Sequence, residues 1–500
     1  MVKKSRVFWI VLLILGIFLI PGCGKRKSTE PEPSHTWTIL GYFNGNNEQD
    51  KKAVNGDTLS YVIQDALEME QVGSTQNVRI IVMLGSFKTE GKCYYYHIKK
   101  HLDEPSDPDS IRSEVLDSLD EKDMSDPLTL RDFIRYGVEH YPADHYVLII
   151  NDHGEGWKGV CYDQQNGDGR MMSLPELSSA LSGYNFKIII FGASSMSMAE
   201  VAYQLKDRAD YLVASQYFGF KRNILGFPIW LGSLTENPNM NVTSLARRIA
   251  MAIHTSAVDR NEEVSISAID LSKVDALTSK IADFGSVLLT HTGDHWKEVV
   301  DARETEITSS QFHFTGYYFD LNKFCQNIRS SANLDLVVKS AAQMVEDAND
   351  AAVFTTLSTQ EELGYGGLCI HFPFKPEDFD SSDYVQLGFA VSGWHNFLSE
   401  FMKAYANANT GSLRVSSIPV GAKILLNGED TGFVTDTTIH GIPPGIYTVR
   451  LVKEGYEDWV SGTVSISAGH TRELPTVLLE PLPPRGSSLS ELHGTKATDF

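Results

Sequence analysis

The sequence has no region in which positive charge is concentrated, and this absence is informative. Its 500 residues hold 43 lysines and arginines against 64 aspartates and glutamates, a formal net charge of -21, and no basic stripe follows residue 30. Nucleic-acid binding needs clustered cations that neutralise phosphates, so nucleic acid is not an expected partner. The composition, 42% hydrophobic and 21% charged, is that of a globular protein, and this length predicts two or three domains.

Cysteine is also scarce, with five in the whole chain. One is Cys23, and the others are Cys93, Cys161, Cys325 and Cys369. No pair has the spacing of a zinc site, so we expect no metal centre. Because an exported compartment permits disulfides, the four later cysteines could form up to two bridges, whose pairing the sequence does not fix.

A long apolar run is missing as well. The run at residues 7–20 is too short for a membrane span, which needs about 20 residues, and it follows Lys3, Lys4 and Arg6. This pattern predicts a signal peptide at residues 1–22, with an uncleaved anchor as the alternative. The closing Ile-Pro-Gly-Cys resembles a bacterial lipobox. The resemblance implies lipidation of Cys23, a polar tether at residues 23–35, and an exported protein anchored through that lipid to the membrane of a bacterial cell envelope.

From residue 36 onward, short apolar runs alternate with helical patterns, which is typical of a mostly parallel sheet flanked by helices in an α/β fold. Ligands bind beyond the carboxyl ends of such strands. The expected strands are residues 37–43, 78–84, 146–150, 187–191 and 211–214, and the expected helices are residues 57–70, 128–141, 173–182 and 196–206.

Two of the expected strand ends carry groups with catalytic chemistry. One strand leads into Asp152-His153-Gly154, and its neighbour leads into Gly192-Ala193-Ser194. An imidazole beside a nucleophile can accept its proton, and backbone N–H groups can stabilise an oxyanion. We therefore predict that His153 is the base, that Ser194 occupies the nucleophile position, and that the amides of Gly154 and Ser194 are the oxyanion donors.

These motifs resemble the clostripain-like cysteine peptidases of the caspase-hemoglobinase fold. The family's His-Gly-x-Gly-Trp is present at residues 153–157, and its Phe-Asp-Ala-Cys-Leu-Met aligns with residues 191–196, followed by Glu-Val-Ala-Tyr at 200–203. Further matches extend the resemblance over residues 36–405. It implies a peptidase-like domain with a peptide or protein ligand. It also implies a possible calcium ion, although residues 163–169 fit a plain turn better than an EF-hand and we expect no cofactor.

The chain departs from the family at the positions that carry the chemistry. Ser194 replaces the cysteine, and Gly192 replaces the acid that recognises Lys or Arg in basic-specific relatives. Ser215-Gln216 replaces the family's Ser-Glu, so the resemblance implies a changed specificity pocket at Gly192, Ser215 and Gln216. The serine hydroxyl is not ionised at neutral pH, whereas the family's thiol is partly ionised to the nucleophilic thiolate.

Each of these residues also has a structural interpretation. Ser194 and Ser195 could be caps of the expected helix at 196–206. Asp152 should point away from His153, because successive side chains on a strand alternate. Cys161 is too close to His153 in sequence to face it from the adjacent strand, so a substitute nucleophile there is not expected.

Beyond residue 410 the pattern changes to short Val, Ile and Thr alternations separated by turns such as Asn427-Gly428. This predicts a small all-β module of hairpins at residues 411–480. Its sequence resembles the PEGA domain, a non-catalytic module of exported bacterial proteins. Residues 481–500 have no periodic pattern and are expected to be a disordered tail.

Three functions are compatible with these patterns. The first, which three simultaneous departures favour, is a lipid-anchored and catalytically degenerate peptidase homologue, a pseudoenzyme that binds ligands in its cleft. The second is a working hydrolase that uses Ser194 and His153. The third is a structural cell-envelope protein that acts through the PEGA-like module.

Overall fold

The computed structural model describes residues 36–482, except for residues 55, 91, 104, 106, 121, 168, 217–222, 294, 305–317, 361–363, 374–378 and 380. The predicted signal peptide, Cys23 and the tether lie outside the described residues. Pro481 and Leu482, at the start of the predicted tail, still pair with Tyr456 and Gly455. No helix in the described ranges is long and apolar enough to cross a bilayer.

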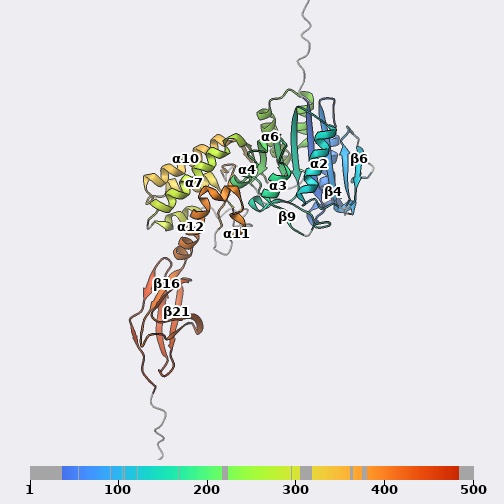
Figure 1. The fold of residues 1–500 in the computed structure, drawn as a ribbon. Helices are drawn as coiled ribbons and strands as arrows, with labels where there is room; N and C mark the ends of the chain where they lie inside the picture. The colour runs from blue at the N-terminus through green and yellow to red at the C-terminus, as the bar shows by residue number, and fades with distance from the viewer. Residues whose placement is uncertain are drawn as a thin grey trace, which may run out of the picture. The chain divides into compact units, whose positions relative to one another are not determined.

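A nine-stranded sheet forms the centre of the first domain, in the order β14-β12-β11-β10-β7-β1-β4-β5-β6 (Figure 1). Its five central strands are parallel. They are β11 (Ala209–Ser215), β10 (Phe186–Gly192), β7 (His145–Asn151), β1 (Trp37–Gly45) and β4 (Val78–Ser86). Every strand that the sequence predicted is present in this parallel core, each slightly longer than predicted, so the expected α/β fold is confirmed.

Two antiparallel strands extend the sheet at each edge. They are β5 (Cys93–His97) and β6 (Glu114–Leu119) on one side, and β12 (Ser265–Asp270) and β14 (Val353–Ser358) on the other. The sequence did not predict these strands. Strand β6 gives no clear strand pattern in the sequence, because most of its residues are exposed and it has no continuous apolar run.

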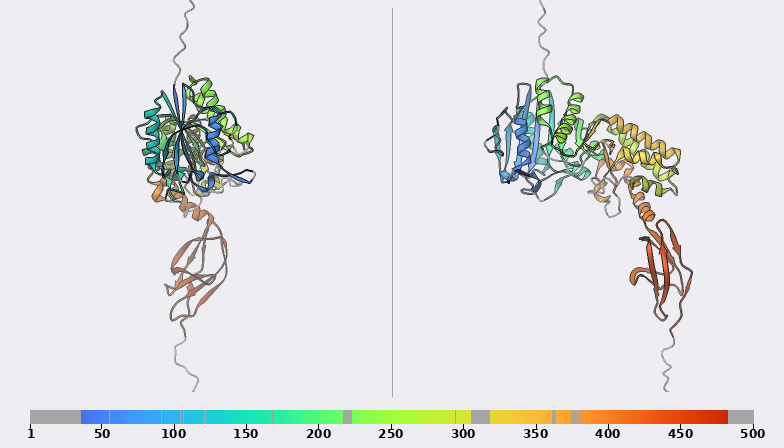
Figure 2. Two further views of the ribbon diagram at one scale, coloured as in Figure 1. Left: turned by 90° about the vertical axis from the view of Figure 1, so that its right-hand side faces the viewer. Right: turned by 180° about the vertical axis from the view of Figure 1, so that it is seen from behind.

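Helices cover both faces of the sheet (Figures 1 and 2). One layer contains α1 (Tyr61–Glu70), α5 (Phe227–Glu236) and α6 (Val242–Asp259), and the other contains α2 (Pro127–His140), α3 (Leu174–Ala180) and α4 (Ala199–Leu205). Side chains along β10 alternate between them: Ile188 and Ile190 pack with the α1 layer, and Ile189 and Phe191 with the α4 layer. By the same alternation, residue 151 on β7 and residue 192 on β10 face the α1 layer.

Side-chain caps set the start of several helices. The Ser60 hydroxyl accepts a hydrogen bond from the Ile63 N–H, and Ser173 and Glu176 form a capping box. The predicted helix start at residue 57 is wrong, because Asp57–Ser60 forms β3, which pairs with β2 (Lys51–Val54). The Ser60 cap explains why α1 begins only at Tyr61.

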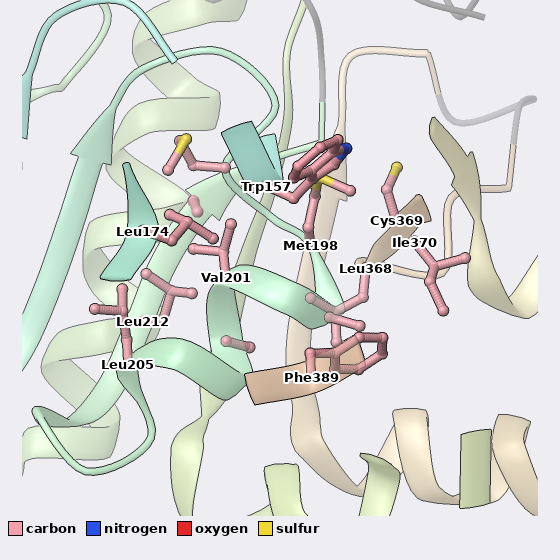
Figure 3. Close-up of a cluster of buried hydrophobic side chains, with 14 of the residues drawn as sticks. Trp157, Leu174, Met198, Val201, Leu205, Leu212, Leu368, Cys369, Ile370 and Phe389 are labelled. Carbon is pink, nitrogen blue, oxygen red and sulfur yellow. The ribbon is translucent and has the colours of Figure 1, made fainter. Parts of the chain in front are cut away.

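The same domain continues into a lobe of helices. They are α7 (Val274–His291), α8 (Trp296–Glu304), α9 (Leu321–Ser330), α10 (Leu336–Ala352), α11 (Ser381–Tyr384) and α12 (Trp394–Asn409). A short antiparallel pair, β13 (Tyr318–Asp320) and β15 (Cys369–His371), connects the lobe to α4. Val201 of α4 belongs to the same buried cluster as Leu368 and Phe389, so one continuous core joins sheet and lobe (Figure 3).

The four cysteines in the described part of the chain are all buried thiols, and none is in a disulfide. They lie on four different elements: Cys93 on β5, Cys161 on β8 (Val160–Tyr162), Cys325 on α9 and Cys369 on β15. Burial raises the pKa of the Cys93 thiol to about 12 and holds those of Cys325 and Cys369 well above their ordinary value. The expectation of disulfides is therefore wrong.

Residues 411–482 form a separate all-β module with its own small core. Its strands are β16 (Gly411–Val415), β17 (Ser417–Ile418), β18 (Lys423–Leu426), β19 (Glu429–Val434), β20 (Thr437–Ile442), β21 (Gly445–Val452), β22 (Trp459–Ile466), β23 (Thr471–Glu473) and β24 (Val477–Leu478). Asn427 and Gly428 join β18 to β19 with φ values of 53° and 92°, as the predicted hairpin turn requires.

Candidate functional site

The register of the parallel sheet places His153 and Ser194 at corresponding positions on neighbouring strands. Asn151 on β7 is the partner of Gly192 on β10, and His153 and Ser194 each follow two residues later. The two segments touch, because a Cβ atom added to Gly154 would lie 2.4 Å from the backbone oxygen of Ser194. We call residues 152–154 and 192–195 the strand-end site.

His153 and Ser194 are both half-buried. The His153 ring packs edge-on against Tyr162, with ring centroids 5.8 Å apart. The Asp152 carboxylate accepts hydrogen bonds from the Asn44 and Asn47 amides at 2.5 and 2.9 Å and from the Tyr162 N–H at 2.7 Å.

A β-hairpin follows His153, in which Gly154 pairs with Val160 and the Cys161 N–H donates to the His153 carbonyl at 3.0 Å. The backbones of Cys161 and His153 are therefore neighbours in this hairpin. The sequence had suggested that Cys161 is too close along the chain to face His153 from an adjacent strand. The Cys161 side chain is fully buried in the core, so the thiol is not exposed to a ligand.

The turn after β10 differs from the one that the sequence predicted. Helix α4 begins at Ala199 rather than residue 196, and its N-cap residue, Met198, makes no side-chain cap. Residues 196–198 run beside β15 instead: the Ser197 hydroxyl donates to the Gly367 carbonyl at 2.6 Å, and the Cys369 N–H donates to the Ser197 carbonyl at 2.9 Å. The interpretation of Ser194 and Ser195 as helix caps is therefore wrong, and Ser195 instead has a left-handed φ of 58°.

The space beside Gly192 is already filled. A Cβ atom there would lie 2.7 Å from the Asn151 Oδ1 atom and 3.0 Å from the Leu225 Cδ1 atom. The Asn151 Nδ2 atom donates to Asp65 at 2.7 Å, and Asp65 also accepts from Asn223 at 3.3 Å. All three polar side chains are buried. An acid at position 192 would therefore require this network to move.

The other two residues of the predicted specificity pocket lie in the interior. Ser215 is fully buried, and its carbonyl accepts a hydrogen bond from the Ser197 N–H at 2.9 Å. The Gln216 amide donates to Asp320 at 2.8 Å and accepts from the Gly367 N–H at 3.1 Å. Gln216 thus ties β11 to the β13–β15 region and does not line an open pocket among the described residues.

A second buried polar group lies behind the strand-end site. One Glu200 oxygen accepts hydrogen bonds from the His371 N–H and the Tyr384 hydroxyl, both at 2.8 Å. Burial raises the pKa of Glu200 to about 7. The Trp157 indole N–H donates to the His371 Nδ1 atom at 3.0 Å, so the loop that carries His153 is anchored to the element that Glu200 holds.

Sequence reasoning missed the residues that support the site. Asp65 could have been noticed, because it is a charged residue on the buried face of α1 between Val62 and Ala66. Asn151 could have been noticed as a polar residue that ends a buried strand. Nothing in the sequence pairs Asn223 with them. No three described His, Cys, Asp or Glu side chains form a group that could hold a metal ion.

The chain matches two protein-family models. The clostripain family model covers residues 53–418, and the PEGA domain model covers residues 410–480. Clostripain from Hathewaya histolytica is 27% identical over 306 residues, which span 51% of this chain and 58% of that protein. The chain therefore aligns with less than two thirds of that relative.

Two solved structures share the fold. An inactive zymogen C11 protease from Parabacteroides distasonis has a TM-score of 0.54 at 20% identity, covering 72% of this chain and 99% of that one. A secreted C11 cysteine protease from Bacteroides thetaiotaomicron, in complex with an irreversible peptide inhibitor, has a TM-score of 0.53 at 21% identity, with the same coverage. At these identities the likeness establishes the fold alone.

Proposed function

This chain belongs to the clostripain family, and we propose that its peptidase-like domain no longer hydrolyses peptides but binds a peptide or protein ligand at the strand-end site. The observation that carries the proposal is the filled space at Gly192. Asn151 and Leu225 occupy the volume that a recognition carboxylate would need, so the site has been rebuilt beyond the change of one nucleophile atom.

The chemistry of the remaining groups supports the same conclusion. A cysteine beside a histidine has a substantial thiolate fraction at neutral pH, whereas a serine depends on a well-oriented base. Serine hydrolases orient that base with a carboxylate. Asp152, the acid next to His153 in sequence, is already bonded to Asn44 and Asn47. A catalytic Ser194 would therefore depend on the orientation of His153.

We expect the purified protein to leave a mixed peptide library uncleaved and to resist labelling by a fluorophosphonate probe. The physical reason is that a serine hydroxyl, unlike the family's thiol, is not ionised at neutral pH. The measurement is mass spectrometry of the library and of the labelled protein. Cleavage or labelling that disappears in both Ser194→Ala and His153→Ala would instead establish the second function, a hydrolase with Ser194 as nucleophile and His153 as base.

The variant Ser194→Cys is the control that separates a lost nucleophile from a rebuilt site. It restores the thiol, yet Asn151 and Leu225 still fill the space beside Gly192, so we expect no cleavage after Lys or Arg. Alkylation of the new thiol by iodoacetamide verifies that it is accessible. If this single change produced cleavage after basic residues, the rebuilding of the specificity site would be refuted.

We further propose that the protein is exported and held at the membrane of the cell envelope by a lipid on Cys23. The support is the charged start, the short apolar run and the Ile-Pro-Gly-Cys ending of residues 1–23. On expression in a bacterium, we expect the chain to partition into the detergent phase of Triton X-114 and the variant Cys23→Ala to lose lipidation, read by mass spectrometry of the N-terminal peptide. Equal partitioning and an unmodified Cys23 would exclude the lipid anchor.

A further inference from the structure

The hairpin that follows His153 has its tip packed inside the protein. It spans residues 154–160, and a β-bridge joins its two sides. Trp157, near the tip, is only 4% exposed and belongs to the buried cluster that joins the sheet to the lobe (Figure 3). A Cβ atom added to Gly156 would lie 2.3 Å from the Met198 Sδ atom, so the backbone of the tip is also closely packed. The position of His153 therefore depends on what holds Trp157.

Two residues, on β15 and α11, contact Trp157. Its indole N–H donates to the His371 Nδ1 atom at 3.0 Å, and its ring lies edge-on to Tyr384 with ring centroids 5.2 Å apart. The rings of His371 and Tyr384 are themselves 4.9 Å apart. An Nδ1 atom that accepts a hydrogen bond carries no proton, so this arrangement requires a neutral His371 ring. We call the contacts among Trp157, His371 and Tyr384 the clasp.

One buried carboxyl group holds both partners of Trp157. A single Glu200 oxygen accepts the hydrogen bonds from the His371 N–H and the Tyr384 hydroxyl, both at 2.8 Å. The other oxygen, Oε2, is buried and has no hydrogen-bond partner among the described residues. Glu200 lies in the first turn of α4, six residues after Ser194. It thus connects the segment that leaves Ser194 to the clasp that holds the hairpin of His153.

No cation pairs with Glu200 in the described part of the chain. The buried residues of α3 and α7, which pack against α4, include no titratable side chain. Burial raises the pKa of Glu200 to about 7, and it holds the pKa values of Cys369 and Tyr384 well above their ordinary range, so both of these are neutral. The titratable groups on the elements around Glu200 are Cys369 and His371 (β15), Tyr384 (α11), Asp320 (β13), Arg303 (α8) and His395 (α12).

We propose that Glu200 is a positioning residue for the strand-end site, and that loss of its proton opens the clasp and releases the hairpin of His153. The inference deepens the proposed function and rests on it, because it assigns a regulation to that site. A protonated Glu200 accepts the two hydrogen bonds of the clasp without a buried charge. An ionised Glu200 keeps an unpaired charge in an apolar interior unless the clasp opens and admits water.

The sign and size of the effect follow from proton linkage. The pKa of Glu200 is about 7 in the closed clasp, and exposure to water in an open clasp returns it to the ordinary value of 4.5. Below pH 4.5 both states hold the proton, and above pH 7 neither does. Between these values the closed clasp loses stability as pH rises, and its opening constant increases to a limit of about 300-fold.

Hydrogen exchange read by mass spectrometry measures this opening in the lipid-free chain that begins at Gly24. The wild type and Glu200→Gln are compared at pH 5, 6, 7 and 8. Comparison at a single pH cancels the intrinsic exchange rate and any protonation of His371, which the two proteins share. We expect the amides of residues 153–160 and 369–371 to be less protected in the wild type, by about fourfold at pH 5 and about 300-fold at pH 8.

Two further variants locate the effect. Trp157→Phe keeps an aromatic ring in the clasp but removes the N–H that reaches His371. We expect its hairpin to exchange about fivefold faster, and the influence of position 200 to persist at residues 369–371 but to vanish from the hairpin. Glu400→Gln alters an exposed residue of α12 that pairs with Lys403, so it is the matched control and should leave the exchange of both segments unchanged.

Two results of the exchange experiment would overturn the inference. Equal protection of the hairpin in the wild type and Glu200→Gln at pH 8 would mean that its opening does not expose Glu200. A wild-type hairpin as well protected as β1 and β4 at pH 8 would mean that it opens only when the whole domain unfolds, so the clasp is no separate device.

Peptide binding connects the clasp to the strand-end site. A pool of fluorescein-labelled random hexapeptides without histidine is titrated at pH 5 and pH 8, and fluorescence anisotropy is measured. We expect the wild type to lose affinity at pH 8 and Glu200→Gln to keep it. If the clasp opens but affinity stays constant in the wild type, Glu200 does not position the site and the inference is overturned. If no peptide binds at either pH, the proposed function fails, and the exchange data alone decide whether the clasp responds to Glu200.

Discussion

The variant Gly154→Ala should lower the free energy of unfolding by about 1–3 kcal/mol, the usual cost of forcing extra atoms into a packed interior. The new Cβ atom would lie 2.4 Å from the Ser194 carbonyl oxygen. This oxygen is part of the backbone, so relief requires the ends of β7 and β10 to move apart. The same movement separates His153 from Ser194, and we expect peptide binding at the strand-end site to weaken together with stability.

Gly232 provides the matched control for this substitution. It lies inside helix α5, and a Cβ atom added there meets nothing within 4 Å. Because alanine favours the helix more than glycine does, Gly232→Ala should stabilise the protein by up to about 1 kcal/mol. Urea unfolding of the wild type and both variants measures the two shifts. Equal shifts of the same sign would contradict the close approach of the two strand ends.

The position of the strand-end site could be predicted from sequence for a physical reason. Buried parallel strands read as continuous apolar runs, and their carboxyl ends meet at one edge of the sheet. Once residues 146–150 and 187–191 were assigned as neighbouring strands, His153 and Ser194 had to lie near each other, and the pairing of Asn151 with Gly192 realises this. Local pattern and sheet geometry were sufficient for that step.

The surroundings of the site could not be predicted in the same way, because they depend on contacts between distant segments. Gln216 is buried by Asp320 and Gly367, more than a hundred residues later in the chain. Helix α4 begins at Ala199 and not at residue 196, because Ser197 forms hydrogen bonds with Gly367 and Cys369. Local propensity favoured a cap at Ser194 or Ser195 and a helix from residue 196. The pairing of residues 197–198 with the distant β15 segment determines the actual start of the helix.

The replacement at position 192 involves more than the absence of one charge. From sequence, glycine there is only the loss of an acid. In the structure, the Asn151 side chain, held by Asp65, lies where a side chain at position 192 would begin. Breaking some of the hydrogen bonds in this buried network would leave polar groups without partners, at a cost in stability. Restoring the acid alone would therefore introduce a clash and an unpaired charge.

The variant Glu200→Gln should make the protein more stable than the wild type at pH 8, by about 3 kcal/mol. Burial raises the pKa of Glu200 from its ordinary value of 4.5 to about 7 in the folded protein. One carboxyl oxygen accepts two hydrogen bonds, and the other, Oε2, has no hydrogen-bond partner among the described residues. A glutamine keeps the two accepted hydrogen bonds and carries no charge that must be desolvated.

The sign of the pH dependence follows from proton linkage. Between pH 4.5 and 7 the folded protein holds a proton on Glu200 that the unfolded chain has released, so the stability contributed by this group falls as pH rises. A shift of about 2.5 pKa units corresponds to about 3 kcal/mol, lost across that window and constant above it. The wild type and Glu200→Gln should therefore be equally stable near pH 4.5 and diverge toward pH 7.

Thermal and urea unfolding at pH 5, 6, 7 and 8 measure this divergence, with Glu400→Gln as the control. Glu400 is an exposed residue of α12 that pairs with Lys403, so its replacement should change stability by no more than about 0.5 kcal/mol at any pH. A constant difference in stability between wild type and Glu200→Gln at all four pH values would mean that Glu200 has the same pKa in the folded and the unfolded protein. His371, which holds Trp157 and so the loop of His153, would then lie against a permanent negative charge, and the anchoring of that loop would not depend on pH.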